Sequence, residues 1–400
     1  MSNHRHFHRL VWLAVAFALG VIVFGAFVRL SNAGLSCPDW PTCYGHAAWP
    51  THAQDVARAN HAFPDRPFET GKAWREQVHR MLAGTLGVLV LLLALLAVRR
   101  RPRGTTIVIV ASVLVALSIP LYVGGWHVAA GTLAALGEVL LIAGALTWSN
   151  TPWSNANADN HSPPHQDAAR IAALTLAMVV FQALLGMWTV SWLVMPIVVM
   201  GHLLGGLATF ALLAAMAWRA TPESWLTLAG AARLRVLLWI GLALLIVQSA
   251  LGGWTSANYA AWACGTDFPK CLDQWWPASD FHQAFVLWRG NSGVDYSGGV
   301  LDNPARVAIQ ISHRVVAFLV FGHLTGVGIR LLRTPGLRSW GTTLLALLVA
   351  QIGLGISNVM FALPLPVAVA HNAGAALLMF VLVTLLARLR EPGDAALATT

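Results

Sequence analysis

Apolar runs of about 20 residues recur along this whole 400-residue chain and constrain its fold more than any other feature. A helix of about 20 residues crosses the roughly 30 Å hydrocarbon core of a bilayer with its backbone groups paired internally. Charged residues make up only 10% of the sequence, against about 25% in soluble proteins. We therefore expect an all-α polytopic membrane protein, with spanning helices at about 10–30, 79–98, 105–122, 128–147, 170–190, 197–217, 233–255, 307–331, 339–361 and 366–387.

The net charge of +9 comes from basic clusters that lie between the apolar runs. With the spans above, every cluster falls on one side of the membrane, which the positive-inside rule identifies as cytoplasmic. The distribution favours the lipid bilayer over nucleic acid as the partner of this charge, and it predicts that both termini are cytoplasmic. The first apolar run is too long for a signal peptide and lacks a cleavage site, so we expect a retained helix. The clusters contain Arg5, Arg9, Arg99, Arg100, Arg101, Arg103, Arg233, Arg235, Arg330, Arg333, Arg338, Arg388 and Arg390.

The four cysteines form two closely spaced pairs, Cys37 with Cys43 and Cys264 with Cys271. One pair lies in each of the long polar loops, 31–78 and 256–306, which then face outward. An oxidising compartment favours two local disulfides, whereas a metal site would need closer spacing and nearby histidines. A role in thiol exchange stays open, because a disulfide that closes a short loop can exchange with a partner.

The chain repeats itself, which predicts two related halves at 1–220 and 221–400. The dipeptide His79-Arg80 matches His313-Arg314, and a proline-containing turn precedes both His202 and His371. The first pair of histidines is 123 residues apart and the second pair 58 residues apart. The excess is what two further helices need, so we expect an inserted hairpin at about 105–150. The motif Gln-x-x-Leu-Gly occurs at 182–186, 248–252 and 351–355.

Four histidines in repeated positions point to haem: His79, His202, His313 and His371. We expect each within about five residues of the outer start of its helix. Polar side chains at matched depth in a membrane are costly and suggest function. Two histidines that face each other across a helical bundle can supply the axial ligands of haem iron, so we expect one haem in each half. The alternative is that each histidine is a hydrogen-bond partner between helices.

The remaining charged and histidine side chains have separate interpretations. Arg80 and Arg314 are expected to pair with haem propionates, as arginine does with carboxylates. His323 lies too deep in the inner half for a ligand role, and we interpret His127 as interfacial, together with Trp126.

The halves differ one helical turn before the first histidine, where Glu76 in the first half corresponds to Gln310 in the second. A carboxylate beside a haem can relay protons or stabilise positive charge. This difference predicts a reactive haem in the first half and an electron-transfer or structural haem in the second. The alternative is that Glu76 forms an interfacial ion pair with Arg75 or Arg80.

The sequence resembles the haem A synthase family, membrane oxidases that convert haem O into haem A for cytochrome oxidase. The resemblance covers most of the chain and is most specific in the first loop, Arg29-Leu-Ser-Asn-Ala-Gly-Leu-Ser-Cys-Pro-Asp-Trp-Pro-Thr-Cys-Tyr-Gly45. Further matching segments are Glu76-Gln-Val-His-Arg80, Gln182-Ala-Leu-Leu-Gly-Met-Trp-Thr-Val190 with His202, Ser312-His-Arg314, and His371.

The resemblance implies two pseudo-symmetric four-helix bundles in a bacterial inner membrane, with the cysteine loops on the periplasmic side. It implies that His79 and His202 ligate the iron of haem O or haem A, that Glu76 is the catalytic carboxylate, and that His313 and His371 ligate haem B. The implied reaction oxidises the C8 methyl of haem O to an alcohol and then to a geminal diol, which loses water to give a formyl group. The inserted hairpin departs from the eight helices of the family.

The resemblance also implies partners: the haem O synthase, an unidentified electron donor and a thiol-disulfide partner of Cys37 and Cys43. The glycine-rich stretch 201–206 leaves a homo-oligomer open. Two other functions remain as alternatives, a di-haem electron-transfer cytochrome and a haem transport or assembly factor. An electron carrier would have equivalent surroundings in both halves, unlike Glu76 and Gln310.

Overall fold

The computed structural model describes residues 2–149, 168–221, 225–290 and 293–392. Within these residues, ten helices are long and apolar enough to cross a membrane, which confirms the prediction of an all-α polytopic membrane protein. They are α1 Ser2–Leu30, α3 Thr70–Val98, α4 Gly104–Val123, α5 His127–Ser149, α6 Ala169–Ser191, α7 Pro196–Ala220, α8 Ala231–Ala257, α10 Asn303–Arg333, α11 Arg338–Met360 and α12 Leu365–Arg388.

Short elements complete the described parts of the chain. The helices α2 Ala53–Ala62 and α9 Phe281–Ala284 lie in the two long loops. The strands β1 Leu226–Thr227 and β2 Leu389–Arg390 pair in parallel. This pairing ties the start of the second half to the end of the last helix.

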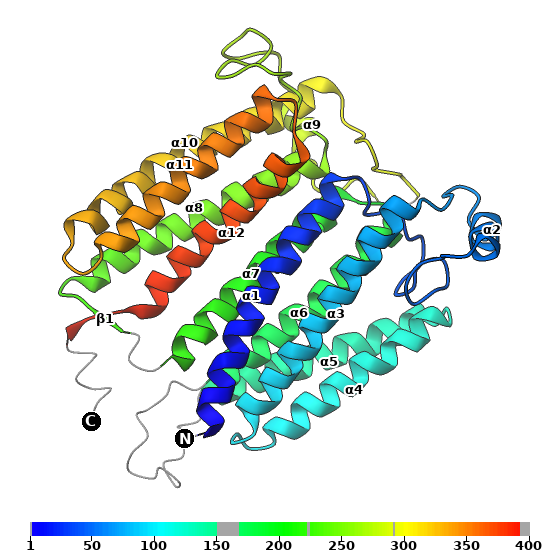
Figure 1. Ribbon diagram of the computed structural model, residues 1–400, viewed down its shortest axis with the longest axis horizontal. Helices are drawn as coiled ribbons and strands as arrows, with labels where there is room; N and C mark the ends of the chain where they lie inside the picture. The colour runs from blue at the N-terminus through cyan, green and yellow to red at the C-terminus, as the bar shows by residue number, and fades with distance from the viewer. Residues whose placement is uncertain (1, 150–167, 222–224, 291–292, 393–400) are drawn as a thin grey trace.

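The long helices pack as two rings of four that lie side by side (Figure 1). In the first ring, α1 packs on α3, α3 on α6, α6 on α7 and α7 on α1. In the second ring, α8 packs on α10, α10 on α11, α11 on α12 and α12 on α8. The rings meet where α7 packs on α8 and α12, and where α1 packs on α12. Each ring therefore has two diagonal pairs of helices that face its interior.

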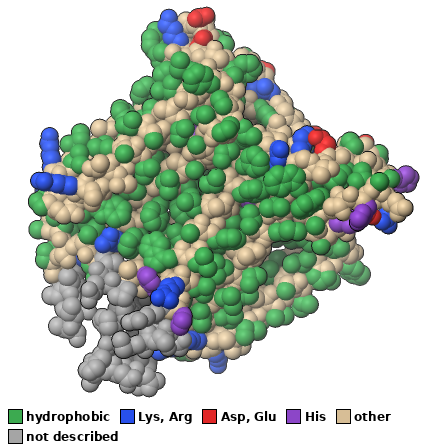
Figure 2. Space-filling view, viewed as in Figure 1, with side chains coloured by type: hydrophobic (Ala, Val, Ile, Leu, Met, Phe, Trp, Pro, Cys, Tyr) green, Lys and Arg blue, Asp and Glu red, His purple; other side chains and the backbone are tan. Residues whose placement is uncertain are grey.

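The predicted inserted hairpin is present as α4 and α5, at the edge of the first ring (Figure 1). It packs on α3 and α6. A side chain at Gly137 would meet the carbonyl oxygen of Ala111 at 2.8 Å, so the close approach of the two hairpin helices depends on this glycine. Hydrophobic side chains cover most of the face in view, and charged side chains lie mainly toward its ends (Figure 2).

Two helices begin earlier than predicted, which corrects the expected position of two histidines. His79 lies nine residues after Thr70, and His313 lies ten residues after Asn303, not within five of the helix start. The expected helix starts were placed where the apolar runs begin. In the structure, the first cysteine loop covers the polar first turns of α3, and Glu76 is buried there. In α10, the Asp302 side chain caps the first turn by accepting a hydrogen bond from the amide of Ala305.

Candidate functional site

The four histidines sit on diagonal helices of the two rings. His79 on α3 faces the interior together with His202 on α7, and His313 on α10 together with His371 on α12. The imidazoles of each pair lie on opposite helices of the same ring, each against a glycine of a helix between them. The structure therefore brings the histidines together in the two pairs that the repeat predicts.

Each imidazole lies against a glycine of a neighbouring helix, and the glycines come from the other diagonal of the ring. A side chain at the glycine would collide with the imidazole or press on it, so the space for the ring depends on the missing Cβ. A Cβ would lie 2.7 Å from the His79 ring at Gly25, 3.4 Å from His202 at Gly186, 3.3 Å from His313 at Gly252 and 3.2 Å from His371 at Gly355. Three of these glycines end the Gln-x-x-Leu-Gly motif, which explains why it recurs.

The glutamine that opens the motif contacts the same histidine. Gln182 donates its amide to the carbonyl oxygen and Nδ1 of His202, both at 2.9 Å. Gln248 donates to the carbonyl oxygen of His313 at 3.2 Å and lies 3.2 Å from its Nδ1. Gln351 lies 3.5 Å from Nε2 of His371. The glutamine thus positions the helix that carries the histidine as well as its ring.

His79 lacks such a glutamine, because α1 carries Val21 four residues before Gly25. The ring of Phe24 stacks near it instead, at 6.4 Å between ring centres. The Nδ1 atom of His79 is buried without a hydrogen-bond partner, and so is Nδ1 of His371.

These histidines fit haem better than a bare metal ion. Among the residues that the structure describes, no cluster of three or more histidine, cysteine or acidic side chains could hold an ion. Haem iron already has four porphyrin nitrogens and takes one or two axial ligands from the protein. Two opposed imidazoles in each ring match this requirement, and one imidazole of each pair, His79 or His371, has a buried Nδ1 without a hydrogen-bond partner.

Glu76 is the buried carboxylate of the first ring. It is 4% exposed, and its Oε2 accepts hydrogen bonds from the Cys37 amide at 2.9 Å and the Ser36 hydroxyl at 3.1 Å. Its Oε1 forms an ion pair with Arg80 at 2.6 Å. Gln310 is equally buried at the matching position, but its Oε1 has no hydrogen-bond partner. The structure therefore surrounds only the carboxylate with donors.

Arg80 is the ion-pair partner of Glu76, as one alternative predicted, whereas the guanidinium of Arg75 lies over the ring of Phe27. Arg80 also donates to three carbonyl oxygens of the first cysteine loop. Arg314 repeats this arrangement in the second half. The acceptors are Cys37, Asp39 and Thr42 for Arg80, at 2.6–3.1 Å, and Asp267, Pro269 and Lys270 for Arg314, at 2.8–3.4 Å. The pairing of either arginine with a haem propionate stays a prediction.

Both cysteine pairs are joined, Cys37 to Cys43 and Cys264 to Cys271. All four cysteines are buried, the most exposed at 3%. A thiol partner would have to open the loop before it could reach either disulfide, so the buried bonds favour a structural role.

An apolar groove of about 620 Å³ lies between α1 and α12, beside the first histidine pair. Phe24 lines the groove and also stacks near His79. The corresponding place between α7 and α8 is filled, because Trp254 is buried there with Ile197 and Met200 packed against it. The other residues that line the groove are Gly20, Val23, Phe27, Leu365, Pro366, Val369 and Ala370.

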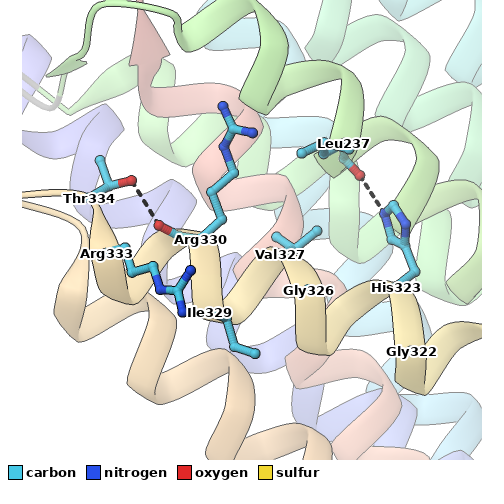
Figure 3. A pocket seen from close by; sticks show the side chains of 9 residues that line it. All are labelled: Leu237, Gly322, His323, Gly326, Val327, Ile329, Arg330, Arg333 and Thr334. Atoms are coloured by element: carbon cyan, nitrogen blue, oxygen red, sulfur yellow. Dashed lines mark hydrogen bonds between the residues drawn. The ribbon is translucent and has the colours of Figure 1, made fainter.

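His323, in the inner half of α10, is separate from both pairs. His323 donates from Nε2 to the backbone carbonyl of Leu237 at 2.9 Å and lines a pocket near the far end of α10 (Figure 3). This contact occupies one nitrogen of the imidazole, and the absence of a ligand role for His323 stays a prediction. The ring of His127 contacts Tyr122 at 5.0 Å, and the ring of Trp40 in the first cysteine loop contacts Tyr122 at 6.1 Å.

The sequence interpretation missed Glu138, in the middle of α5. Its Oε2 is buried without a hydrogen-bond partner. The signal was present in the sequence, because Glu76 and Glu138 are the only acidic residues within the ten helices. A carboxyl group at this depth is a functional candidate by default.

Two rings of four helices, each with two opposed histidines, define a class of polytopic membrane protein with an internally repeated histidine-pair site. The chain matches the family COX15-CtaA, described as cytochrome oxidase assembly protein, over residues 8–140 and 128–383. It is 36% identical over 381 residues to Heme A synthase of Shewanella oneidensis, covering 94% of this chain and 96% of that protein. The chain therefore belongs to the COX15-CtaA family.

More distant relatives match over nearly the same span. Heme A synthase of Paracoccus denitrificans is 26% identical over 398 residues, covering 95% of this chain and 86% of that protein. Heme A synthase COX15 of Homo sapiens is 26% identical over 392 residues, covering 92% of this chain and 79% of that protein. The similarity thus extends across both halves.

Proposed function

We propose that this protein is a haem A synthase, a membrane oxidoreductase that acts on haem O. The single observation that carries the proposal, beyond family membership, is that two matched histidine pairs differ in one carboxylate. Glu76 lies one helical turn from His79, whereas Gln310 holds the same place before His313. An electron carrier would need no such difference between its two haem surroundings.

In this proposal His79 and His202 hold the substrate, haem O, and His313 and His371 hold haem B as a resident cofactor. The C8 methyl of haem O is hydroxylated twice, and the geminal diol loses water to give the formyl group of haem A. Haem B supplies one-electron transfer when bound.

In this proposal the residues around the substrate position its two imidazole ligands and place a negative charge beside it. Gly25 and Gly186 leave space for the two imidazoles, and Gln182 fixes the helix that carries His202. Glu76, held by Ser36, Cys37 and Arg80, provides a fixed negative charge and a proton acceptor near His79.

The apolar groove beside Phe24 supports the assignment of haem O to the first ring. Haem O carries a long isoprenoid chain that haem B lacks, and an apolar chain needs an apolar surface. The groove reaches the first histidine pair through Phe24 and also passes Ala370, which precedes His371 on α12, whereas its counterpart between α7 and α8 is filled by Trp254. An isoprenoid chain that leaves the first ring beside Phe24 could therefore lie in this groove.

The proposed location is a bacterial inner membrane, with cytoplasmic termini and periplasmic cysteine loops. The bacterial relatives and the ten apolar helices support a multi-pass membrane protein. The haem O synthase is the proposed source of substrate, because the apolar isoprenoid chain of haem O favours transfer between membrane proteins. A homo-oligomer is a further proposal, and so is a thiol partner of Cys37 and Cys43, which would act only after the loop that buries this disulfide has opened.

Analysis of the haems in purified protein tests the proposal. Haem B together with haem O or haem A in one preparation is the expected result, and haem B alone in both sites contradicts it. The variant Glu76→Gln should abolish haem A while haem B is retained. The glutamine side chain can still accept a hydrogen bond from the Cys37 amide, so the loop should stay in place. Haem O bound to the variant would then show that the binding site is intact.

A further inference from the structure

The pocket near the far end of α10 lies between α10 and α8, at the end of the rings opposite the cysteine loops (Figure 3). Its volume is about 520 Å³. Leu237, Val327 and Ile329 provide apolar walls, and Gly322 and Gly326 leave the surface of α10 bare between them. A Cβ at either glycine would meet no atom within 4 Å, so the bare surface faces open space.

The deep end of this pocket is held by contacts between α8 and α10. The hydrogen bond from His323 to the carbonyl of Leu237 joins the two helices, and Leu324 packs tightly on Gly241. A Cβ at Gly241 would lie 2.9 Å from the Leu324 side chain. These contacts fix α8 and α10 relative to each other at the deep end of the pocket, so the pocket exists before a ligand binds.

Two arginines stand at the rim of the pocket, Arg330 and Arg333, in the last turns of α10. Both are exposed. Within the described part of the chain, neither guanidinium has an ion-pair partner or a hydrogen-bond acceptor; the Thr334 hydroxyl binds only the backbone carbonyl of Arg330. Two unpaired cations therefore adjoin an apolar groove where a membrane helix ends.

We infer that this pocket binds one anionic phospholipid, with the phosphate at Arg330 and Arg333 and an acyl chain along Gly322 and Gly326. A guanidinium pairs with a phosphate group through parallel hydrogen bonds, and the apolar groove accommodates a hydrocarbon chain. A zwitterionic lipid carries no net charge to balance the two arginines, whereas an anionic lipid does. This inference does not depend on the proposed function.

Native mass spectrometry of the full-length detergent-solubilised protein, titrated with phosphatidylglycerol or phosphatidylcholine, tests the headgroup. Wild-type protein should bind phosphatidylglycerol more tightly. Each arginine near a membrane surface contributes about fivefold in affinity for anionic lipid. The double variant Arg330→Gln with Arg333→Gln should therefore weaken the binding of phosphatidylglycerol by about twenty-five-fold. Arg338→Gln is the matched control, because Arg338 is exposed nearby but does not line the pocket. An equal loss in the control, or none in the double variant, overturns the inference.

The glycine face is tested separately from the charge. Gly326→Leu should fill the groove and lower phosphatidylglycerol affinity although both arginines remain. Gly131→Leu, on α5, is the matched control, because it also faces open space and lies far from the pocket in the sequence. Unchanged affinity in Gly326→Leu would contradict the placement of the acyl chain.

Discussion

The two rings of helices share a scaffold and differ mainly in the side chains around the first histidine. In both, a glycine makes space for each imidazole and an arginine holds the cysteine loop. The first ring has Glu76 where the second has Gln310, and Val21 where the second has Gln248. The shared parts place two opposed imidazoles in each ring, and in the proposed function the few differences decide which ring reacts. Variants that exchange or remove these differences test this division.

The largest expected effect comes from removing a ligand in one ring at a time. His79→Leu should lose the haem of the first ring and His371→Leu that of the second, about half of the total haem in each case. His323→Gln should lose none, because His323 lies outside both pairs. Haem content per protein and the type of extracted haem measure the result. Loss of both haems from a single variant would mean that the rings do not bind independently.

Exchanging the carboxylate tests whether chemistry resides in the first ring. Glu76→Gln should reduce haem A formation by about a hundredfold or more, as expected for loss of a positioned acid–base group. Gln310→Glu should leave haem A formation unchanged, because in the proposed function the second ring holds haem B and not the substrate. The amount of haem A in membranes, normalised to haem B, is the measurement. Full activity of the Gln variant would remove Glu76 from the mechanism.

The glycines should differ in their tolerance of a methyl group. Gly25→Ala places Cβ 2.7 Å from the His79 ring, whereas Gly252→Ala places it 3.3 Å from His313. Overpacking of this kind costs about 1–3 kcal/mol, so Gly25→Ala should weaken haem binding in its ring more than Gly252→Ala. Gly20→Ala is the control, since its Cβ would meet nothing within 4 Å. Equal effects of all three would contradict the packing that distinguishes them.

The smallest effect concerns the cysteine loops, where Tyr44 follows Cys43 and Leu272 follows Cys271. Burial, with the nearby charge of Glu76, raises the pKa of Tyr44 to about 12. The stabilisation is complete below pH 10, the pKa of tyrosine in an unfolded chain, and is lost as pH rises through 12. Tyr44→Phe should move the alkaline unfolding midpoint up by about one pH unit. An unchanged midpoint would show that another group controls alkaline unfolding.

The sequence alone could predict the helices, the paired histidines and the cysteine pairs, because each has a strong periodic or compositional signal. It could not place the starts of α3 and α10, since a polar first turn such as that around Glu76 remains helical only when a loop covers it. The contacts of Gly25 and Gly355 with imidazoles were also hidden, because they depend on which helices become neighbours. Glu138 was visible in the sequence but was overlooked, since it has no counterpart in the repeat.

The hydrogen bond from the Cys37 amide to Glu76 couples the conformation of the first cysteine loop to the charge state of this carboxylate. Opening the loop removes a hydrogen-bond donor from the carboxylate. Neutralising the carboxylate weakens the hydrogen bond that holds the loop, and the coupling free energy is the same in both directions. At the matching position of the second ring, Oε1 of Gln310 has no hydrogen-bond partner, so this particular link between the cysteine loop and the residue one turn before the histidine is missing. Reducing the disulfide of the first cysteine loop is therefore expected to change the surroundings of Glu76 as well.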